Sequence, residues 1–278
     1  MSDPSPAPAM PDSVDTEQFN VVVRAVRHVI AGTLDLFEAV GDVILFAIGA
    51  LLRLVQPPFR IGHLMTTMEF VGVGSLAIVL LTGVFTGAVF AIQTAVAFEI
   101  FNAKSLIGGS VALALVRELA PSLSALMVAG RVGSAMTTEL GTMRVTEQID
   151  ALEVMAVDPV HYLVAPRILA CIVTMPLLTT GFNAVGLFGA YLVSTGMLGI
   201  DDAMFFSRIY LWVTPDDIAI SLVKALHFGA AIGAVASYKG FHAKGGSRGV
   251  GLATTSTVVT SSIVVLVLDY VVTTLWMR

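Results

Sequence analysis

The sequence predicts an all-α integral membrane protein, in which an N-terminal interfacial amphipathic helix precedes five transmembrane helices. Of its 278 residues, 56% are apolar and only 13% are charged, whereas charged residues make up roughly a quarter of a typical soluble domain. Three stretches contain no charged residue: 70–98, 168–200 and 249–268. A spanning helix needs about 20 residues, so each stretch is long enough to cross a bilayer.

Composition also excludes other classes of protein. Cys171 is the only cysteine, so the chain is not an extracellular disulfide scaffold. The formal net charge of −5 argues against a nucleic-acid partner, which would require a basic surface. The five histidines show no metal-ligand spacing, and we expect no metal site.

The N-terminal part divides into two segments. Residues 1–17 contain four acids and four prolines, which predicts a disordered acidic cytoplasmic tail. In residues 18–58, apolar residues recur at helical spacing but charges interrupt them, which is typical of an interfacial (elbow) helix rather than a spanning one. Residues 59–278 form the membrane domain.

The five spans follow from the charge-free stretches and from two further apolar stretches that contain few charges. Lysine and arginine, rather than net charge, determine the orientation of such a chain. Seven basic residues lie on one side of the five spans and three on the other, which places the N-terminus and the 139–167 and 239–248 loops in the cytoplasm. The expected spans are approximately 68–98, 105–138, 165–198, 216–238 and 249–274.

Small residues at every fourth position mark three of the spans, for example Gly83, Gly87, Ala91 and Ala95 in the first. This spacing keeps them on one helix face, where they let two backbones approach closely. Packing within one subunit is the favoured interpretation. A subunit interface or a moving surface is the alternative.

The 139–167 loop contains the most informative charged segment. A short amphipathic helix over 145–158 is predicted, because Val145, Ile149, Leu152 and Ala156 share one face while acids occupy another. The apolar face must rest on something, and anionic lipid headgroups would repel the acids. A helix that docks on a protein partner is therefore favoured over a passive loop.

The same region resembles a known family. Residues 129–167 read AGRVGSAMTTELGTMRVTEQIDALEVMAVDPVHYLVAPR, with LVRELAPSLSALM before them and KGGSRGVGLATTSTVVTSSIVVLVLD after them. These motifs are similar to those of the MlaE (YrbE) permeases, over roughly residues 60–275. The resemblance implies an MlaE-type permease fold and a bacterial inner-membrane location. It also implies a homodimer with two cytoplasmic ABC ATPase subunits and a periplasmic MCE-domain protein, which together move phospholipid.

The resemblance also implies a role for the loop helix, which would couple the permease to the ATPase. No lysine follows a glycine in this sequence, so a phosphate-binding P-loop is absent. We therefore expect no enzyme activity and no directly bound cofactor, with ATP and Mg²⁺ handled by the partner ATPase. The implied coupling residues are Glu147, Gln148, Ile149, Asp150, Ala151, Leu152 and Met155.

Polar residues within the spans are the remaining candidates. Ionisable groups at membrane depth are costly and suggest function, and the resemblance implies a lipid cavity between subunits near spans one, two and five. Arg117, Glu118 and Gln93 are candidates to line it. For Arg117, a lipid headgroup contact competes with a structural ion pair. For Lys224, snorkelling to the nearer headgroups is expected, and Asp269 is expected to cap a helix or to pair.

An ion-coupled secondary transporter of a lipophilic substrate is the alternative function. Such a protein would favour acids near mid-membrane and an internal repeat of broken helices. The three clean spans contain no acid, and we find no repeat. The ABC permease is therefore the preferred hypothesis.

Overall fold

The computed structural model describes residues 38–53 and 61–276, and within them the chain is helical without strands. Residues 38–53 are helical, while the predicted tail 1–17 and the remainder of the predicted 18–58 segment lie outside the described residues. Among the described residues, five helical stretches are long and apolar enough to cross a membrane, which confirms an all-α membrane protein. They are Ile61–Glu99, Lys104–Val145, Val160–Gly196, Pro215–Phe241 and Gly246–Trp276.

The first span consists of α2 (Ile61–Val71) and α3 (Val73–Glu99), which meet at Gly72. The span begins earlier than the predicted residue 68, because Glu69 does not end the helix. Two threonines of α2 bond back to carbonyls of their own helix, Thr66 to Gly62 at 3.1 Å and Thr67 to His63 at 2.9 Å. Glu69 is therefore part of a helix that begins before the charge-free stretch 70–98.

The second span is a helix interrupted by two π-helical turns. It runs from η1 (Lys104–Leu106) through α4 (Ile107–Ala114), α5 (Ala120–Val128) and α6 (Ser134–Val145). The π-turns are η2 (Leu115–Leu119) and η3 (Ala129–Gly133). Each π-turn inserts a residue into the helical repeat and occurs frequently at functional sites. Both turns of this span contain an arginine.

The remaining spans are η4 (Val160–Val164) with α8 (Ala165–Gly196), then α10 (Pro215–Phe241) and α11 (Gly246–Trp276). The segment between α8 and α10 contains a helix that the sequence analysis did not predict, α9 (Asp202–Trp212). Its N-cap is Asp201, whose carboxylate accepts a hydrogen bond from the Met204 amide at 3.1 Å. Phe205 is buried against the glycine-rich start of α4.

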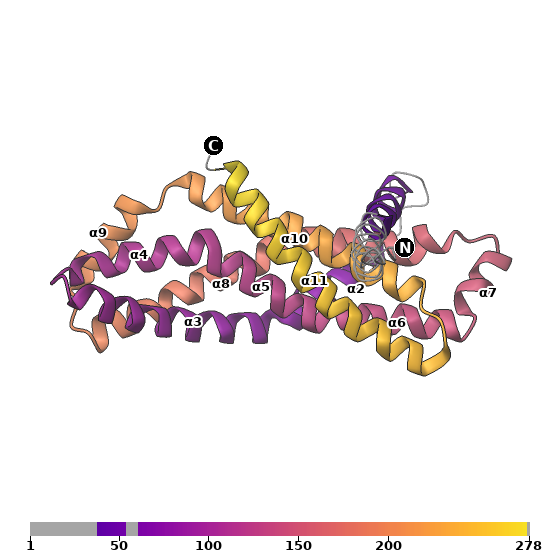
Figure 1. Ribbon diagram of the computed structural model, residues 1–278, viewed down its shortest axis with the longest axis horizontal. Coiled ribbons are helices and arrows are strands. Elements are labelled where there is room, and N and C mark those ends of the chain that lie inside the picture. Colours follow the sequence, from indigo (N-terminus) through magenta and orange to yellow (C-terminus); the bar gives the residue numbers. More distant parts are fainter. Residues whose placement is uncertain (1–37, 54–60, 277–278) are drawn as a thin grey trace, which may run out of the picture. The chain divides into compact units, whose positions relative to one another are not determined.

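The small-residue face of α3 packs on α8, with the two helices side by side in Figure 1. The predicted Gly83, Gly87, Ala91 and Ala95 are all buried. A Cβ added at Gly87 would lie 1.8 Å from the carbonyl oxygen of Gly186, so glycine is required there. This stripe therefore packs within one subunit, as the favoured interpretation predicted.

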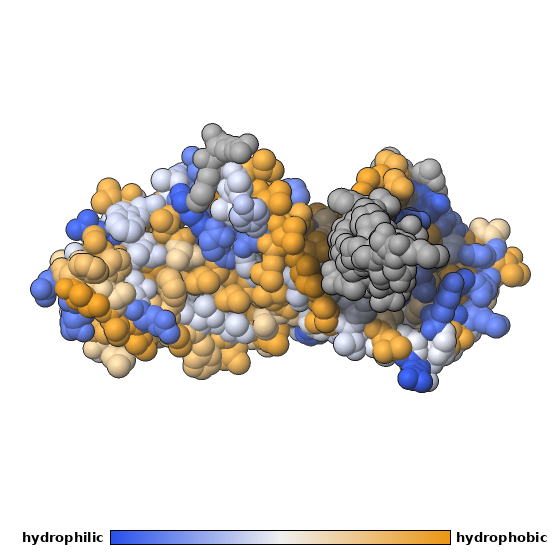
Figure 2. Space-filling model, viewed as in Figure 1, coloured by the Kyte–Doolittle hydropathy of each residue, from blue (hydrophilic) through white to orange (hydrophobic). Residues whose placement is uncertain are grey.

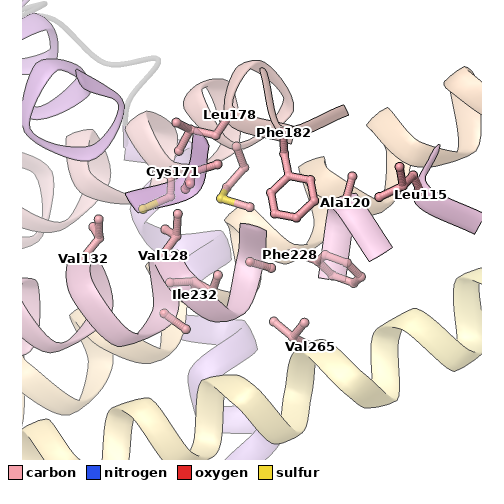
Figure 3. Packing of buried hydrophobic residues seen from close by; sticks show 14 of the residues in the cluster. Leu115, Ala120, Val128, Val132, Cys171, Leu178, Phe182, Phe228, Ile232 and Val265 are labelled. Atoms are coloured by element: carbon pink, nitrogen blue, oxygen red, sulfur yellow. The ribbon is translucent and has the colours of Figure 1, made fainter. Parts of the chain in front are cut away.

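The core forms where α8 and α10 meet the second span. Figure 3 shows apolar side chains from these elements pointing toward one another, with one contribution from α11. Cys171 is one of them and behaves as a small apolar residue, as expected. The labelled members of the cluster are Leu115, Ala120, Val128, Val132, Cys171, Leu178, Phe182, Phe228, Ile232 and Val265.

The surface separates into apolar and polar regions. α11 is the least buried of the five spans and α10 the most buried. On the face shown in Figure 2, hydrophobic residues follow α11, while hydrophilic residues gather where α6 and α7 (Gln148–Val154) lie. A bundle that exposes long apolar helix faces is suited to a lipid environment.

We predict that Gly189→Ala destabilises the bundle, because the new Cβ would lie 2.2 Å from the Val84 carbonyl oxygen on α3. Separating the two helices should cost about 1–3 kcal/mol. Thermal unfolding of the purified protein in detergent measures the change. Gly196→Ala, two turns further along α8 with nothing within 4 Å, is the matched control. Equal stability of the two variants would contradict this account of the α3–α8 contact.

Candidate functional site

The charged connection between the second and third spans contains a helix of two turns. α6 ends at Val145, and Glu147 adopts a left-handed conformation with φ 60° before α7 (Gln148–Val154) begins. Ala156 is also left-handed, with φ 58°. L-residues in this region do not continue a right-handed helix. The helix is therefore shorter than the predicted 145–158, because backbone reversals stand at both ends.

The apolar side of α7 is covered by its own chain. Ile149 is fully buried in a cluster with Leu140 of α6 and Leu163 of η4, and Leu152 packs against it. Ile149 therefore needs no protein partner to cover it, whereas Leu152 keeps part of its surface exposed. Sequence periodicity placed Ile149 and Leu152 on one face, but Val145 and Ala156, predicted on the same face, are exposed. Periodicity also carried no information about which surface covers Ile149.

The opposite side of α7 is exposed and acidic. Glu147, Gln148, Asp150 and Ala151 are exposed, and Met155 follows at 64% exposure. Asp150 forms an ion pair with Arg144 of α6, with 2.6 Å between Nη1 and Oδ1. α7 lies at one end of the bundle and α9 lies at the other (Figure 1). The predicted coupling residues thus divide into Ile149, which is buried, Leu152, which is partly buried, and an exposed edge that combines polar residues with Ala151 and Met155.

A second group of charged residues lies inside the bundle around Lys224 of α10. The Lys224 side chain is 0% exposed, and its Nζ lies 2.6 Å from Oε2 of Glu118 on η2. The same Nζ lies 2.8 Å from Oδ1 of Asp269 on α11. A buried ammonium group is stable only when counter-charges and hydrogen-bond acceptors surround it. Lys224 therefore joins the second, fourth and fifth spans.

The third partner of Lys224 is the backbone carbonyl of Arg117. Pro121 has no N–H to donate to the carbonyl of Arg117, four residues earlier. The Lys224 ammonium donates to that carbonyl oxygen instead, at 2.9 Å. On the far side of the cluster, Ser122 donates to Oδ2 of Asp269 at 3.0 Å. The LVRELAPS segment thus supplies a carboxylate, a freed carbonyl and a hydroxyl to one cluster.

The guanidinium of Arg117 turns toward a different carboxylate. Its Nε donates to Oδ1 of Asp217 at the start of α10. The other oxygen of Asp217 accepts from the amide and the hydroxyl of Thr214, at 2.7 and 2.9 Å. This is a capping box that begins the fourth span and holds the carboxylate in place. The ion cluster thus consists of two cations, Lys224 and Arg117, and three carboxylates, which belong to Glu118, Asp217 and Asp269.

The structure bears on three of the expectations from the sequence. Arg117 forms the structural ion pair, although its side chain keeps 39% exposure. Asp269 pairs, as expected. Snorkelling is wrong for Lys224, because the ammonium bonds across the bundle rather than extending to the headgroups.

Asp217 and Ser122 were missed as members of the cluster. The signal for Asp217 was present, because a threonine three residues before an acid at a helix start is a capping signature. The sequence carried no comparable signal for its pairing with Arg117, a hundred residues earlier.

Gln93 lies in a hollow rather than in the ion cluster. The hollow has a volume of about 420 Å³. The turn η2 contributes Leu119 to it, but Arg117 and Glu118 do not line it. The three lipid-cavity candidates are therefore near one another in the fold without sharing one pocket. The lining residues are Phe85, Thr86, Val89, Phe90, Gln93 and Leu119.

The model of one protein family, Permease MlaE, matches residues 64–275. The chain belongs to the MlaE permease family. The match includes nearly all of the five spans, together with α7 and the ion cluster. This membership confirms the resemblance seen in the 129–167 motif, and it identifies a multi-pass membrane permease.

Curated relatives of this MlaE-family chain come from bacteria and from a plant. A probable ABC transporter permease protein of Rickettsia conorii is 41% identical over 88% of this chain and 95% of its own length. The intermembrane phospholipid transport system permease protein MlaE of Haemophilus influenzae is 40% identical, over 86% and 92%. The chloroplastic protein TRIGALACTOSYLDIACYLGLYCEROL 1 of Arabidopsis thaliana is 36% identical, over 82% and 65%.

We predict that Lys224→Met destabilises this MlaE-family chain by about 3–5 kcal/mol, because Glu118 and Asp269 then lose their shared cation. Adding Glu118→Gln and Asp269→Asn to the same chain should recover part of that loss. Unfolding in detergent with increasing SDS measures both.

Lys104→Met is the control for this prediction, because Lys104 pairs with Glu99 at 52% and 65% exposure. Removing that pair should change the free energy of unfolding by less than about 1 kcal/mol. A Lys224 variant as stable as the Lys104 variant would contradict the structural role of the cluster.

Proposed function

We propose that this chain is the membrane subunit of an ABC transporter that moves phospholipids between the inner membrane and MCE-type carrier proteins. A separate ATPase supplies the energy, so ATP and Mg²⁺ bind to that partner. The observation that carries the proposal is the family match over five spans, together with about 40% identity to a permease named for intermembrane phospholipid transport. The chain is a transport subunit rather than an enzyme.

The proposed contact with the ATPase is the exposed edge of α7. Glu147, Asp150 and Met155 are accessible there, while Ile149 holds the helix against α6 and η4. A helix that is anchored to the bundle on one side and exposed on the other is suited to transmit a movement of the ATPase to the spans. We propose that closure of two ATPase subunits moves α7 and shifts the spans along their small-residue faces.

The proposed lipid path lies between two copies of the chain. α3 and α11 expose most of their apolar side chains, which leaves long surfaces for a partner copy and for lipid. The hollow that contains Gln93 opens on α3, and the half-exposed Arg117 and Glu118 lie on η2. A homodimer that encloses these surfaces would form a cavity with apolar walls and a few polar groups, as a phospholipid requires.

The proposed location is the bacterial inner membrane, with the N-terminus in the cytoplasm. The α7 end is then cytoplasmic and the α9 end periplasmic. The seven basic residues on the first side support this orientation. The ATPase would then approach α7 and the MCE-type carrier would approach the α9 end.

The ion-coupled transporter remains the second candidate, because Glu118, Asp217 and Asp269 lie in or at the ends of the spans. Each of these carboxylates pairs with Lys224 or Arg117. Coupling by a titrating acid would require one of these pairs to open. The family membership therefore favours the ABC permease.

We predict that Glu147→Lys weakens binding of the partner ATPase while the permease still assembles in the membrane, because the acidic edge of α7 becomes basic. The control is Glu99→Lys, which makes the same charge change at an exposed acid at the C-terminal end of α3, away from α7. Co-purification from membranes measures the amount of ATPase bound per permease.

For Asp150, the double change Arg144→Asp with Asp150→Lys restores the local ion pair with its polarity reversed. If the negative charge itself contacts the ATPase, the double variant binds as weakly as Asp150→Lys alone. Unchanged binding by Glu147→Lys and both Asp150 variants would refute the docking assignment.

We predict that the purified complex transfers labelled phospholipid in liposomes only when ATP is present, and that Arg117→Ala lowers transfer. The Arg117 result counts only where the variant assembles with its partners and retains ATPase activity. A complex that lacks an ATPase, or a transfer rate independent of ATP and sensitive to an ion gradient, would favour the second candidate.

A further inference from the structure

A second hollow lies near Gly72, where α2 meets α3, on a different set of residues from the one that contains Gln93. Its volume is about 410 Å³. One cation, Arg131, and one carboxylate, Glu69, face it, and the ion pairs of the described residues do not include a pair between them. The lining residues are Thr66, Glu69, Phe70, Val73, Gly74 and Arg131.

Arg131 reaches this hollow from the neighbouring span. It lies on the π-turn η3, and its Nη1 donates to the Phe70 carbonyl oxygen at 3.2 Å and to the Ser75 hydroxyl at 3.0 Å. The guanidinium also lies over the Phe70 ring, 5.4 Å from its centre. A Cβ at Gly74 would lie 2.5 Å from Nη2 of Arg131, so glycine provides the passage. The arginine is therefore held in position before any ligand binds.

Glu69 faces the same hollow and is exposed. Within the part of the chain that the structure describes, its carboxylate forms no hydrogen bond or ion pair, and Arg131 bonds to neutral groups alone. An arginine and a carboxylate that share a hollow without pairing leave both charges available to a ligand. A ligand that matches both must itself carry an anion and a cation.

The position along the span sets the depth of the hollow in the membrane. Glu69 is the last charged residue before the charge-free stretch 70–98, so it marks the boundary between hydrocarbon and headgroups. Arg131 contacts Phe70 and Ser75, at the start of that stretch. The two charges thus stand at the level where phospholipid headgroups lie.

We propose that this hollow binds the headgroup of a phospholipid that carries a primary amine, with the phosphate on Arg131 and the ammonium on Glu69. Arginine binds phosphate by charge-assisted hydrogen bonds, and a primary ammonium donates to a carboxylate where a quaternary one cannot. The site rests on the proposed function only in that its ligand is a membrane lipid. It lies apart from the Gln93 hollow and would select lipid by headgroup.

Native mass spectrometry of the purified full-length protein tests this site with added phosphatidylethanolamine, phosphatidylcholine and phosphatidylglycerol. The wild-type protein should retain phosphatidylethanolamine preferentially. Glu69→Gln should abolish the preference while phosphatidylglycerol still binds. Arg131→Gln should lower retention of all three lipids by about tenfold, through loss of a charged hydrogen bond to phosphate.

Glu99→Gln, which changes an acid at the other end of the same span, is the matched control and should bind lipids as the wild type does.

Competition with inorganic phosphate is the second arm of the experiment. If it displaces the lipid at equal concentration, the hollow is a free-anion site and the lipid assignment fails. An unchanged lipid preference in Glu69→Gln overturns the proposal. Glu69 has no described partner, so this variant keeps the test independent of any folding defect in Arg131→Gln.

This test is separate from the test of transport. Binding that depends on Glu69 and Arg131, in a complex that does not transfer lipid, would support the site and refute the proposed function. Transfer that is driven by ATP, with lipid binding insensitive to both substitutions, would do the reverse.

Discussion

The ammonium group of Lys224 determines how three of the five spans pack. It lies where water does not reach, so it must find its partners within the protein, and it finds them on η2 and α11. Because one partner is the backbone carbonyl freed by Pro121, the cluster depends on the helix geometry of the second span as well as on its side chains. Movement of these spans relative to one another would have to break or carry these contacts.

Two π-turns carry the charged residues of the inner part of the second span. One turn contains Arg117 and Glu118, and the other contains Arg131. A π-turn adds a residue to the helical repeat and changes the direction of the side chains around it. The charged groups are thus directed to neighbouring helices, to α10 and α11 in one case and to α2 and α3 in the other.

Glycines determine what lies close together elsewhere. On α3, Gly87 permits backbone contact with α8, while Gly74 permits the crossing of Arg131. The same helix therefore combines a tightly packed face with an open hollow at each of two levels. A permease requires both, because the helices must stay associated while leaving surface for a bulky amphipathic substrate.

The sequence by itself determined the fold class, the five spans and the position of the charged connection, because lipid excludes charge and helical periodicity is local. It also predicted that Ile149 lies on an apolar face. Only the tertiary structure decided which surface covers that residue, that Lys224 bonds across the bundle, and that Arg131 shares a hollow with Glu69. These outcomes depend on contacts between residues far apart in the chain, which local spacing does not encode.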